Sequence, residues 1–354
     1  MTAPLPLCVI GAGLVGLRHA EVAAASPRID LTAVVEPDPP RIAALRDRGL
    51  PAVADLSQVP GHTRAAVVAT PTPAHLETAR AALARGWPLI VEKPLADTLD
   101  NARALIAEAE AAGLPLFTGH HRRCHPFVAA AREALGRIGA PVAVQGLWSL
   151  RKHDAYYDVP WRTRPGAGPL MTNLSHEIDL LGHLFGRVAE VSALSSNARR
   201  GLAIEDTAAI ALRFDNGALG SILMSDAGAS PWSFEAATGE NPTIAASGED
   251  YLRFTGTEGA LAFPSLTAWG RSGPGEIEWG RPLARSDGPA FARVDPLREQ
   301  IDRFAAVVAG GEDDTLCTGP QGRDALEMTL AAALSAGTGT RIARNAVPGD
   351  YDGT

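Results

Sequence analysis

A glycine-rich turn near the start of the chain constrains the fold most strongly. Gly11, Gly13 and Gly16 follow an apolar run at residues 7–10 and precede a helical stretch at 17–25. The Gly-x-Gly-x-x-Gly spacing is common by chance, but a strand before it and a helix after it make it specific. The first glycine allows the tight bend, the second lets a pyrophosphate approach the backbone, and the third allows close helix packing. The N–H groups at the start of the helix then favour phosphate, so the turn predicts dinucleotide binding.

An acidic side chain stands at the position expected to meet the ribose of the dinucleotide. Glu36 ends the next apolar run, at residues 31–35, and lies 20 residues after the last glycine of the turn. Its carboxylate can accept hydrogen bonds from a ribose 2′-hydroxyl and would repel a 2′-phosphate. Glu36 therefore predicts NAD as the cofactor, whereas Arg41 nearby leaves NADP as the alternative.

The first 118 residues alternate between strands and helices. Apolar runs predict strands at 7–10, 31–35, 65–69, 89–91 and 115–118, with helices at 17–25, 39–49, 72–85 and 98–112 between them. Short connections between alternating strands and helices favour a parallel sheet with helices on both faces. We therefore expect residues 1–120 to form an NAD(P)-binding α/β domain, a Rossmann doubly wound parallel sheet.

The pattern changes after residue 120 to that of an α+β domain. Asn216-Gly217 joins two strands, at 207–214 and 218–224, which is a hairpin signal. Further strands are predicted at 142–150, 232–238, 251–254 and 261–263, helices at 126–135, 173–185, 297–308 and 321–336, and a Gly/Pro-rich surface loop at 270–289. Residues 121–354 are thus expected to form a substrate-binding and oligomerisation domain with a large open antiparallel sheet, whose C-terminal helix can pack back on the first domain. Because an open sheet must be covered by helices or by another subunit, we expect a homodimer or homotetramer formed through this sheet.

Composition excludes several other classes of protein. Hydrophobic residues make up 46% and charged residues 20% of the chain, which is typical of a globular protein and not of a disordered one. A net charge of −8 argues against a nucleic-acid partner or an anionic membrane surface, and no apolar run is long enough to span a bilayer. The three cysteines, Cys8, Cys124 and Cys317, are too widely spaced for a disulfide framework or a zinc pattern, so a cytoplasmic location is expected.

Five short motifs taken together resemble those of the Gfo/Idh/MocA (glucose–fructose oxidoreductase / inositol dehydrogenase) family. They are Gly11–Gly16, Ala69-Thr70-Pro71-Thr72-Pro73-Ala74-His75, Glu92-Lys93-Pro94, Gly119-His120-His121-Arg122-Arg123 and Asn173-Leu174-Ser175-His176-Glu177-Ile178-Asp179. The Glu-Lys-Pro turn with the downstream His-x-x-Asp helix is the most specific pair. The resemblance covers nearly the whole chain and implies a nucleotide-binding domain followed by an open-sheet domain. Members are mostly NAD(P)-dependent dehydrogenases or reductases of sugars, cyclitols and related ring alcohols.

The resemblance also implies two catalytic residues. Lys93 is expected to be the catalytic lysine, at the carboxyl edge of the parallel sheet and before a cis bond to Pro94, where its ammonium would polarise a substrate oxygen. His176 is expected to remove a hydroxyl proton as hydride leaves, a task suited to a near-neutral pKa. Asp179, one turn later, would orient His176 or bind a substrate hydroxyl, or it serves the structure alone. A solvated lysine and a structural histidine are the alternatives.

One position departs from the family pattern. Inositol dehydrogenases carry an aspartate four residues before the histidine, and this chain has Thr172 there, beside Asn173. Threonine cannot ionise, so it cannot share a proton with His176. Either Lys93 and His176 suffice, with Asn173 or Asp179 in the polar role, or the reaction differs from simple alcohol oxidation.

The remaining candidate site residues follow from the motifs and from the loop at 151–169. Residues expected to contact the cofactor are Gly11, Ala12, Gly13, Leu14, Val15, Gly16, Glu36, Arg41, Thr70, Pro71, Thr72, Pro73, His75, Glu92, Lys93 and His121. Residues expected to contact the substrate are Arg123, Lys152, Tyr156, Trp161, Arg162, Thr172, Asn173 and Asp179. Rings in the loop could stack on an apolar sugar face and cations could hold hydroxyls or a carboxylate, although a plain basic surface loop is the alternative. No metal site is expected, because Arg122 and Arg123 would repel a dication beside His120, His121, Cys124 and His125.

The function expected from these features is an NAD-dependent dehydrogenase that oxidises a secondary hydroxyl of a cyclitol or sugar, a small polyhydroxylated ring. Hydride would pass to C4 of the nicotinamide, His176 would take the proton, and Lys93 would stabilise the developing oxyanion. Two alternatives stay open: a dehydrogenase of a hydroxylated ring acid or cis-dihydrodiol, and a non-catalytic dinucleotide-binding sensor.

Overall fold

The computed structural model describes residues 3–289 and 294–354, which divide into two compact units. Unit 1 comprises Met1–Cys124 and Asp295–Leu326, and unit 2 comprises His125–Val294 and Glu327–Thr354. The chain therefore leaves unit 1 after Cys124, close to the boundary expected at residue 120, and returns to it at Asp295. Among the described residues, no helix has both the length and the apolar character needed to cross a bilayer.

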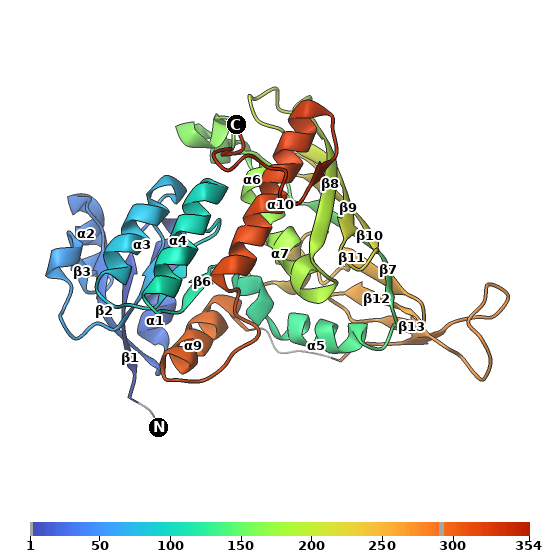
Figure 1. Ribbon diagram of the computed structural model, residues 1–354, viewed down its shortest axis with the longest axis horizontal. Coiled ribbons are helices and arrows are strands. Elements are labelled where there is room, and N and C mark those ends of the chain that lie inside the picture. Colours follow the sequence, from blue (N-terminus) through green and yellow to red (C-terminus); the bar gives the residue numbers. More distant parts are fainter. Residues whose placement is uncertain (1–2, 290–293) are drawn as a thin grey trace. The chain divides into compact units, whose positions relative to one another are not determined.

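A six-stranded parallel sheet forms the centre of unit 1 (Figure 1). Its strands are β1 (Leu5–Ile10), β2 (Ile29–Val35), β3 (Ala52–Val53), β4 (Ala65–Val68), β5 (Leu89–Val91) and β6 (Leu116–Thr118). Its helices are α1 (Leu14–Ala25), α2 (Pro39–Asp47), α3 (His75–Leu83), α4 (Leu99–Ala111) and α9 (Pro296–Val308), with 3₁₀ turns η1 (Leu56–Gln58), η2 (Thr72–Ala74) and η3 (His121–Cys124). The strand order β3-β2-β1-β4-β5-β6 confirms the doubly wound sheet. Because the order reverses between β1 and β4, their carboxyl ends mark where such sheets bind ligands.

Burial explains why this half of the sequence is easy to interpret. Every residue of β4 and of β5 is fully buried, as expected for parallel strands covered on both faces. A side-chain cap marks the start of α4, which follows β5: the Asn101 N–H donates to Oγ1 of Thr98, the residue before the helix, at 3.2 Å.

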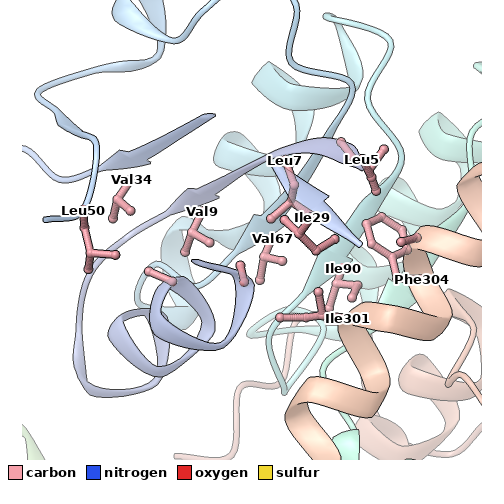
Figure 2. Packing of buried hydrophobic residues seen from close by; sticks show 14 of the residues in the cluster. Leu5, Leu7, Val9, Ile29, Val34, Leu50, Val67, Ile90, Ile301 and Phe304 are labelled. Carbon is pink, nitrogen blue, oxygen red and sulfur yellow. The ribbon is translucent and has the colours of Figure 1, made fainter. Parts of the chain in front are cut away.

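Helix α9 belongs to unit 1 because its apolar face fills the core of that unit. Ile301 and Phe304 are fully buried in the same hydrophobic cluster as Leu5, Leu7 and Ile90 (Figure 2). The ring of Phe304 also meets that of Phe117 edge-on, with 6.0 Å between centroids. The predicted helix at 297–308 is thus confirmed, and it completes the first unit.

A nine-stranded sheet dominates unit 2. Its strands are β7 (Pro141–Ser149), β8 (Val188–Ser196), β9 (Thr207–Phe214), β10 (Leu219–Ser225), β11 (Leu252–Gly256), β12 (Ala260–Phe263), β13 (Ala268–Gly270), β14 (Ala284–Ser286) and β15 (Ile342–Ala343). Its helices are α5 (Pro126–Leu135), α6 (Pro169–Thr172), α7 (Leu174–Leu184), α8 (Phe234–Thr238) and the second part of α10 (Gly319–Thr338), with 3₁₀ turns η4 (Asp154–Asp158) and η5 (Pro160–Thr163). The order is β14-β13-β12-β11-β7-β10-β9-β8-β15, and β10 pairs with β7 in parallel, whereas the other neighbours are antiparallel. The sheet is therefore mostly antiparallel, which confirms the large antiparallel sheet expected from the sequence, and the β7–β10 pair makes it mixed.

Several local predictions for unit 2 are wrong. Residues 232–238, predicted as a strand, contain α8, because Ser233 Oγ caps it by accepting the Ala236 N–H at 3.1 Å and Gly239 ends it in the left-handed region. The Gly/Pro-rich segment 270–289, predicted as a surface loop, contains β14. Strand β8 was not predicted. The helix predicted at 173–185 is confirmed as α7, and the short helix α6 precedes it.

Candidate cofactor-binding and catalytic residues

Neighbouring backbone atoms lie so close to two glycines of the glycine turn in unit 1 that residues with a side chain cannot replace them. Gly11 has φ +95°, and a Cβ there would lie 2.7 Å from the Ala69 carbonyl oxygen. A Cβ at Gly16 would lie 2.0 Å from the Gly11 oxygen. A Cβ at Gly13 would have no neighbour within 4 Å, and α1 begins at the next residue, Leu14. The turn thus leaves open space at the start of a helix, which fits a pyrophosphate.

Glu36 is fixed directly behind this turn. It is buried, its Oε2 accepts the Ala12 N–H at 3.1 Å, and its Oε1 accepts the Asp38 N–H at 3.1 Å. Arg41 is largely exposed, and its guanidinium approaches two acidic groups, with Nη1 3.9 Å from Glu36 Oε2 and Nε 3.5 Å from Asp38. The arginine that could have favoured a 2′-phosphate therefore pairs with these carboxylates.

His75 is a buried side chain that links two backbone segments, and it does not lie on the surface. Its ring is 1% exposed, with Nε2 2.9 Å from the Thr70 carbonyl oxygen and Nδ1 3.0 Å from the Pro94 carbonyl oxygen. Burial lowers the pKa of His75, against the opposing effect of these two oxygens. The ring ties the segment after β4, where η2 carries Thr72 and Pro73, to the turn after β5.

That second turn contains Glu92, Lys93 and Pro94, and the Lys93–Pro94 peptide bond is cis, as the resemblance implies. Glu92 is buried, and its Oε2 accepts the backbone N–H of Lys93 at 3.0 Å. The other oxygen, Oε1, lies 2.7 Å from Nε2 of His19, a fully buried side chain of α1. Sequence reasoning missed His19, whose only signal was its place three residues after the last glycine of the turn.

Arg123 is held within unit 1. Its side chain is 4% exposed and its Nη1 donates to Oε1 of Gln321, on α10, at 2.8 Å. His121 lies in η3, close enough to Glu92 to help stabilise the negative charge of that carboxylate.

In unit 2 the structure brings four predicted substrate residues together. Nζ of Lys152 donates to Oδ1 of Asn173 at 3.0 Å and lies 4.9 Å from the centre of the Tyr156 ring. Oγ1 of Thr172 also donates to Asn173 Oδ1, at 2.9 Å. Burial lowers the pKa of Lys152, and the nearby Asp226 carboxylate, 3.4 Å away, opposes that effect.

Asp226 is the unpredicted centre of this group. It is 1% exposed, follows β10, and pairs with Lys152 and with Nε of Arg200 at 3.2 Å. The hydroxyl of Tyr157 donates to Asp226 Oδ2 at 2.5 Å, and burial together with this bond raises the pKa of Tyr157. A buried aspartate with two cations and a phenol fixes the loop at 151–158.

The other aromatic and basic residues of the loop stack on one another. The Arg162 guanidinium lies 4.0 Å from the centre of the Tyr156 ring, and its Nη1 donates to the Tyr156 carbonyl oxygen at 3.0 Å. The same guanidinium lies 5.6 Å from the ring of Trp161, which is 51% exposed.

His176 and Asp179 lie one turn apart on α7, and both are buried. The His176 N–H donates to the Asn173 carbonyl oxygen at 3.1 Å, so His176 sits in the first turn after Asn173. Between them, Glu177 accepts a hydrogen bond from the Tyr251 hydroxyl at 3.0 Å. The backbone of His176 is thus bonded to the backbone of Asn173, whose side chain accepts from Lys152, within unit 2.

Comparison with known proteins finds family models that match each half of the chain. Residues 6–120 match the family model described as oxidoreductase family, NAD-binding Rossmann fold, and residues 128–262 match the GFO/IDH/MocA C-terminal domain. Myo-inositol dehydrogenase Hyg17 of Streptomyces leeuwenhoekii is 32% identical over 285 residues, 78% of this chain and 79% of that protein. D-apiose dehydrogenase of Paraburkholderia graminis is 30% identical over 213 residues, and the chain spans about half of its length, 56%.

Solved structures share the fold over nearly the whole chain. An oxidoreductase from Agrobacterium radiobacter, in complex with NAD+, L-tartaric acid and magnesium, superimposes with a TM-score of 0.79 at 20% identity, covering 96% of this chain and 98% of that one. Unit 1 is accordingly an NAD-binding Rossmann domain, and the chain belongs to the Gfo/Idh/MocA family of oxidoreductases.

Proposed function

We propose that this protein is an NAD-dependent dehydrogenase that oxidises a secondary hydroxyl of a cyclitol or sugar. The observation that carries the proposal is the turn after β5, where Lys93 is fixed by its own N–H bond to the buried Glu92 within an NAD-binding domain. Glu36, fixed behind the glycine turn with Arg41 already paired, favours NAD over NADP.

The reaction needs an acid–base pair and a hydride acceptor. Bound NAD supplies the acceptor, C4 of its nicotinamide ring. The ammonium of Lys93 donates a hydrogen bond to the substrate hydroxyl oxygen and stabilises the negative charge that develops there. A ring nitrogen of His176 takes the hydroxyl proton as the carbon–hydrogen bond breaks.

A ring acid is the second candidate substrate, and one observation favours it. Beside Thr172, where inositol dehydrogenases carry an aspartate, the structure has the Lys152 ammonium bonded to Asn173. A cation at this position suits a substrate with a carboxylate better than an aspartate would.

A substrate panel tests the proposal. We expect nicotinamide reduction with NAD and at least one member of a panel of inositols, aldoses and ring hydroxy acids, and no reduction when His176→Ala replaces the wild type. Turnover of an acid, but not of its neutral analogue, would select the second candidate. Binding of NAD without turnover of any member would favour the sensor alternative.

We also propose that the exposed face of the unit 2 sheet joins copies of this chain. Leu194, Leu219 and Leu223 are each about half exposed or more, and strand register places Leu194 and Leu223 on either side of Ala209 on one face. Light scattering after size-exclusion chromatography should give a dimer or tetramer, and Leu223→Asp should shift it towards monomer.

A further inference from the structure

We propose that His19 is a positioning residue for Lys93, acting through the buried carboxylate of Glu92. This inference rests on the proposed function, because it assigns His19 a part in the reaction of Lys93. No motif of the family resemblance includes His19, and its side chain lies within the interior of unit 1.

The three residues form a continuous chain of short contacts. His19 Nε2 lies 2.7 Å from Glu92 Oε1, and the Lys93 N–H donates to Glu92 Oε2 at 3.0 Å. The carboxylate has little room to move, since a Cβ at Gly119 would lie 2.7 Å from Glu92 Oε1. Both oxygens of Glu92 are therefore used, one toward α1 and one toward the catalytic turn.

The charge on Glu92 settles which group donates. Burial alone would raise the pKa of Glu92, but the hydrogen bond from His19 and the charges of His19, His121 and Lys93 lower it to about 2. An ionised carboxylate only accepts hydrogen bonds, so Nε2 of His19 carries the proton. The titratable groups that face this carboxylate are His19 on α1, His121 in η3, His75 at the start of α3, and Lys93 in its own turn.

His19 has no other evident task for its polar atoms. Its Nδ1 is buried and has no hydrogen-bond partner among the residues the structure describes. A buried nitrogen without a partner costs free energy, so an apolar side chain would suit this place better unless the contact with Glu92 matters.

Loss of the hydrogen bond from His19 would change the charge beside the Lys93 ammonium and the position of the Lys93 backbone. A buried carboxylate without this partner would take up a proton or turn away from the Lys93 N–H. Either event removes negative charge beside the Lys93 ammonium and loosens the backbone that aims it. Misplacement of a reacting group by about 1 Å can cost about a hundredfold in rate.

The test compares His19→Leu, His19→Gln and Glu92→Gln with the wild type. Glutamine can place an N–H donor near the position of histidine Nε2, whereas leucine cannot. For H19L we expect kcat to fall about tenfold to a hundredfold, with an NAD dissociation constant within about threefold of wild type. The alkaline limb of kcat/KM against pH should move to lower pH in H19L and E92Q, and H19Q should restore both kcat and the limb.

Two results would overturn the inference: an H19L profile that coincides with wild type, or equal loss in H19L and H19Q with an unmoved alkaline limb, as a purely structural role predicts. If H19L does not fold, the comparison of H19Q with E92Q decides, because only E92Q should shift the limb. Lys93→Met, measured alongside, separates the two proposals. Full turnover in K93M would reject the role of Lys93 itself, whereas an inactive K93M with a normal H19L would reject only the role of His19.

Discussion

Nζ of Lys152 lies 3.0 Å from Oδ1 of Asn173, three residues before His176. An ammonium can only donate, so the carboxamide oxygen must face it, and the Thr172 hydroxyl donates to the same oxygen. The amide nitrogen of Asn173 consequently points away from Lys152 and Thr172. In the proposed enzyme, this N–H donor takes the polar role that an aspartate has in inositol dehydrogenases.

Replacing Lys152 by methionine should weaken substrate binding. The substitution keeps the length of the side chain but frees the Asn173 carboxamide to rotate, so we expect KM for the substrate to rise about tenfold, the effect of losing about 1.4 kcal/mol. Asp226 keeps Arg200 and Tyr157 as partners, so the fold should persist. Arg151→Met is the matched control, because that neighbouring side chain is 58% exposed and pairs only loosely with Asp154, at 3.8 Å. An unchanged KM in K152M would remove Lys152 from the substrate site.

Replacing Glu36 should change the choice of cofactor. In Glu36→Ala the acceptor for a ribose 2′-hydroxyl is lost and Arg41 loses one of its two acidic neighbours. We expect KM for NAD to rise about tenfold or more and the preference for NAD over NADP to shrink by a similar factor. Steady-state kinetics with both cofactors measures this. Arg41→Ala serves as the control and should leave the NAD constants nearly unchanged, and equal discrimination in E36A and wild type would contradict the assignment.

The free energy of unfolding should decrease at acidic pH, and part of that decrease should come from protonation of Glu92. Its pKa is lowered to about 2 in the folded state from an ordinary value of 4.5, so its contribution is full above pH 4.5 and is lost as the pH falls from there to 2. A shift of this size corresponds to about 3 kcal/mol of unfolding free energy at most. Urea unfolding from pH 7 to pH 3 should therefore show a steeper loss for wild type than for Glu92→Gln. Parallel curves for the two proteins would mean that the carboxylate is not held as described.

The placement of α9 in the core of unit 1 can be tested by a substitution that leaves a cavity there. Phe304→Ala removes a fully buried ring from the cluster that includes Leu5 and Ile301, so we expect a loss of about 3–5 kcal/mol in unfolding free energy. Val307→Ala on the same helix is the control, since Val307 only packs against the edge of the cluster. A loss below about 1 kcal/mol in F304A would contradict the placement of α9 in this core.

The parallel sheet could be predicted because local sequence patterns identify its strands. Residues 65–68 and 89–91 are uninterrupted apolar runs. Turn glycines separate strands from helices, as Gly11 does after the run at 7–10 and Gly86 does before the run at 89–91. The family membership followed in the same way, from motifs that are contiguous in the sequence.

Other features could not be predicted, because their cause lies elsewhere in the chain. Strand β8 lacks a strict alternation of apolar and polar residues, and its pairing with β9 and β15 makes it a strand. Residues 232–238 have the aromatic content of a strand, yet the Ser233 cap selects a helix. His19 lies 73 residues from Glu92, and Asp226 lies far from the loop it holds, so no local pattern reveals either contact.

The most direct test of the proposed function measures NAD reduction and NAD binding side by side in wild type, Lys93→Ala and His176→Ala. We expect turnover of at least one polyhydroxylated ring by the wild type, and a loss of at least about a hundredfold in kcat for both variants. Fluorescence titration should give NAD dissociation constants for the variants close to that of the wild type. Full turnover in either variant, or loss of NAD binding together with activity in Lys93→Ala, would contradict the roles proposed for these residues.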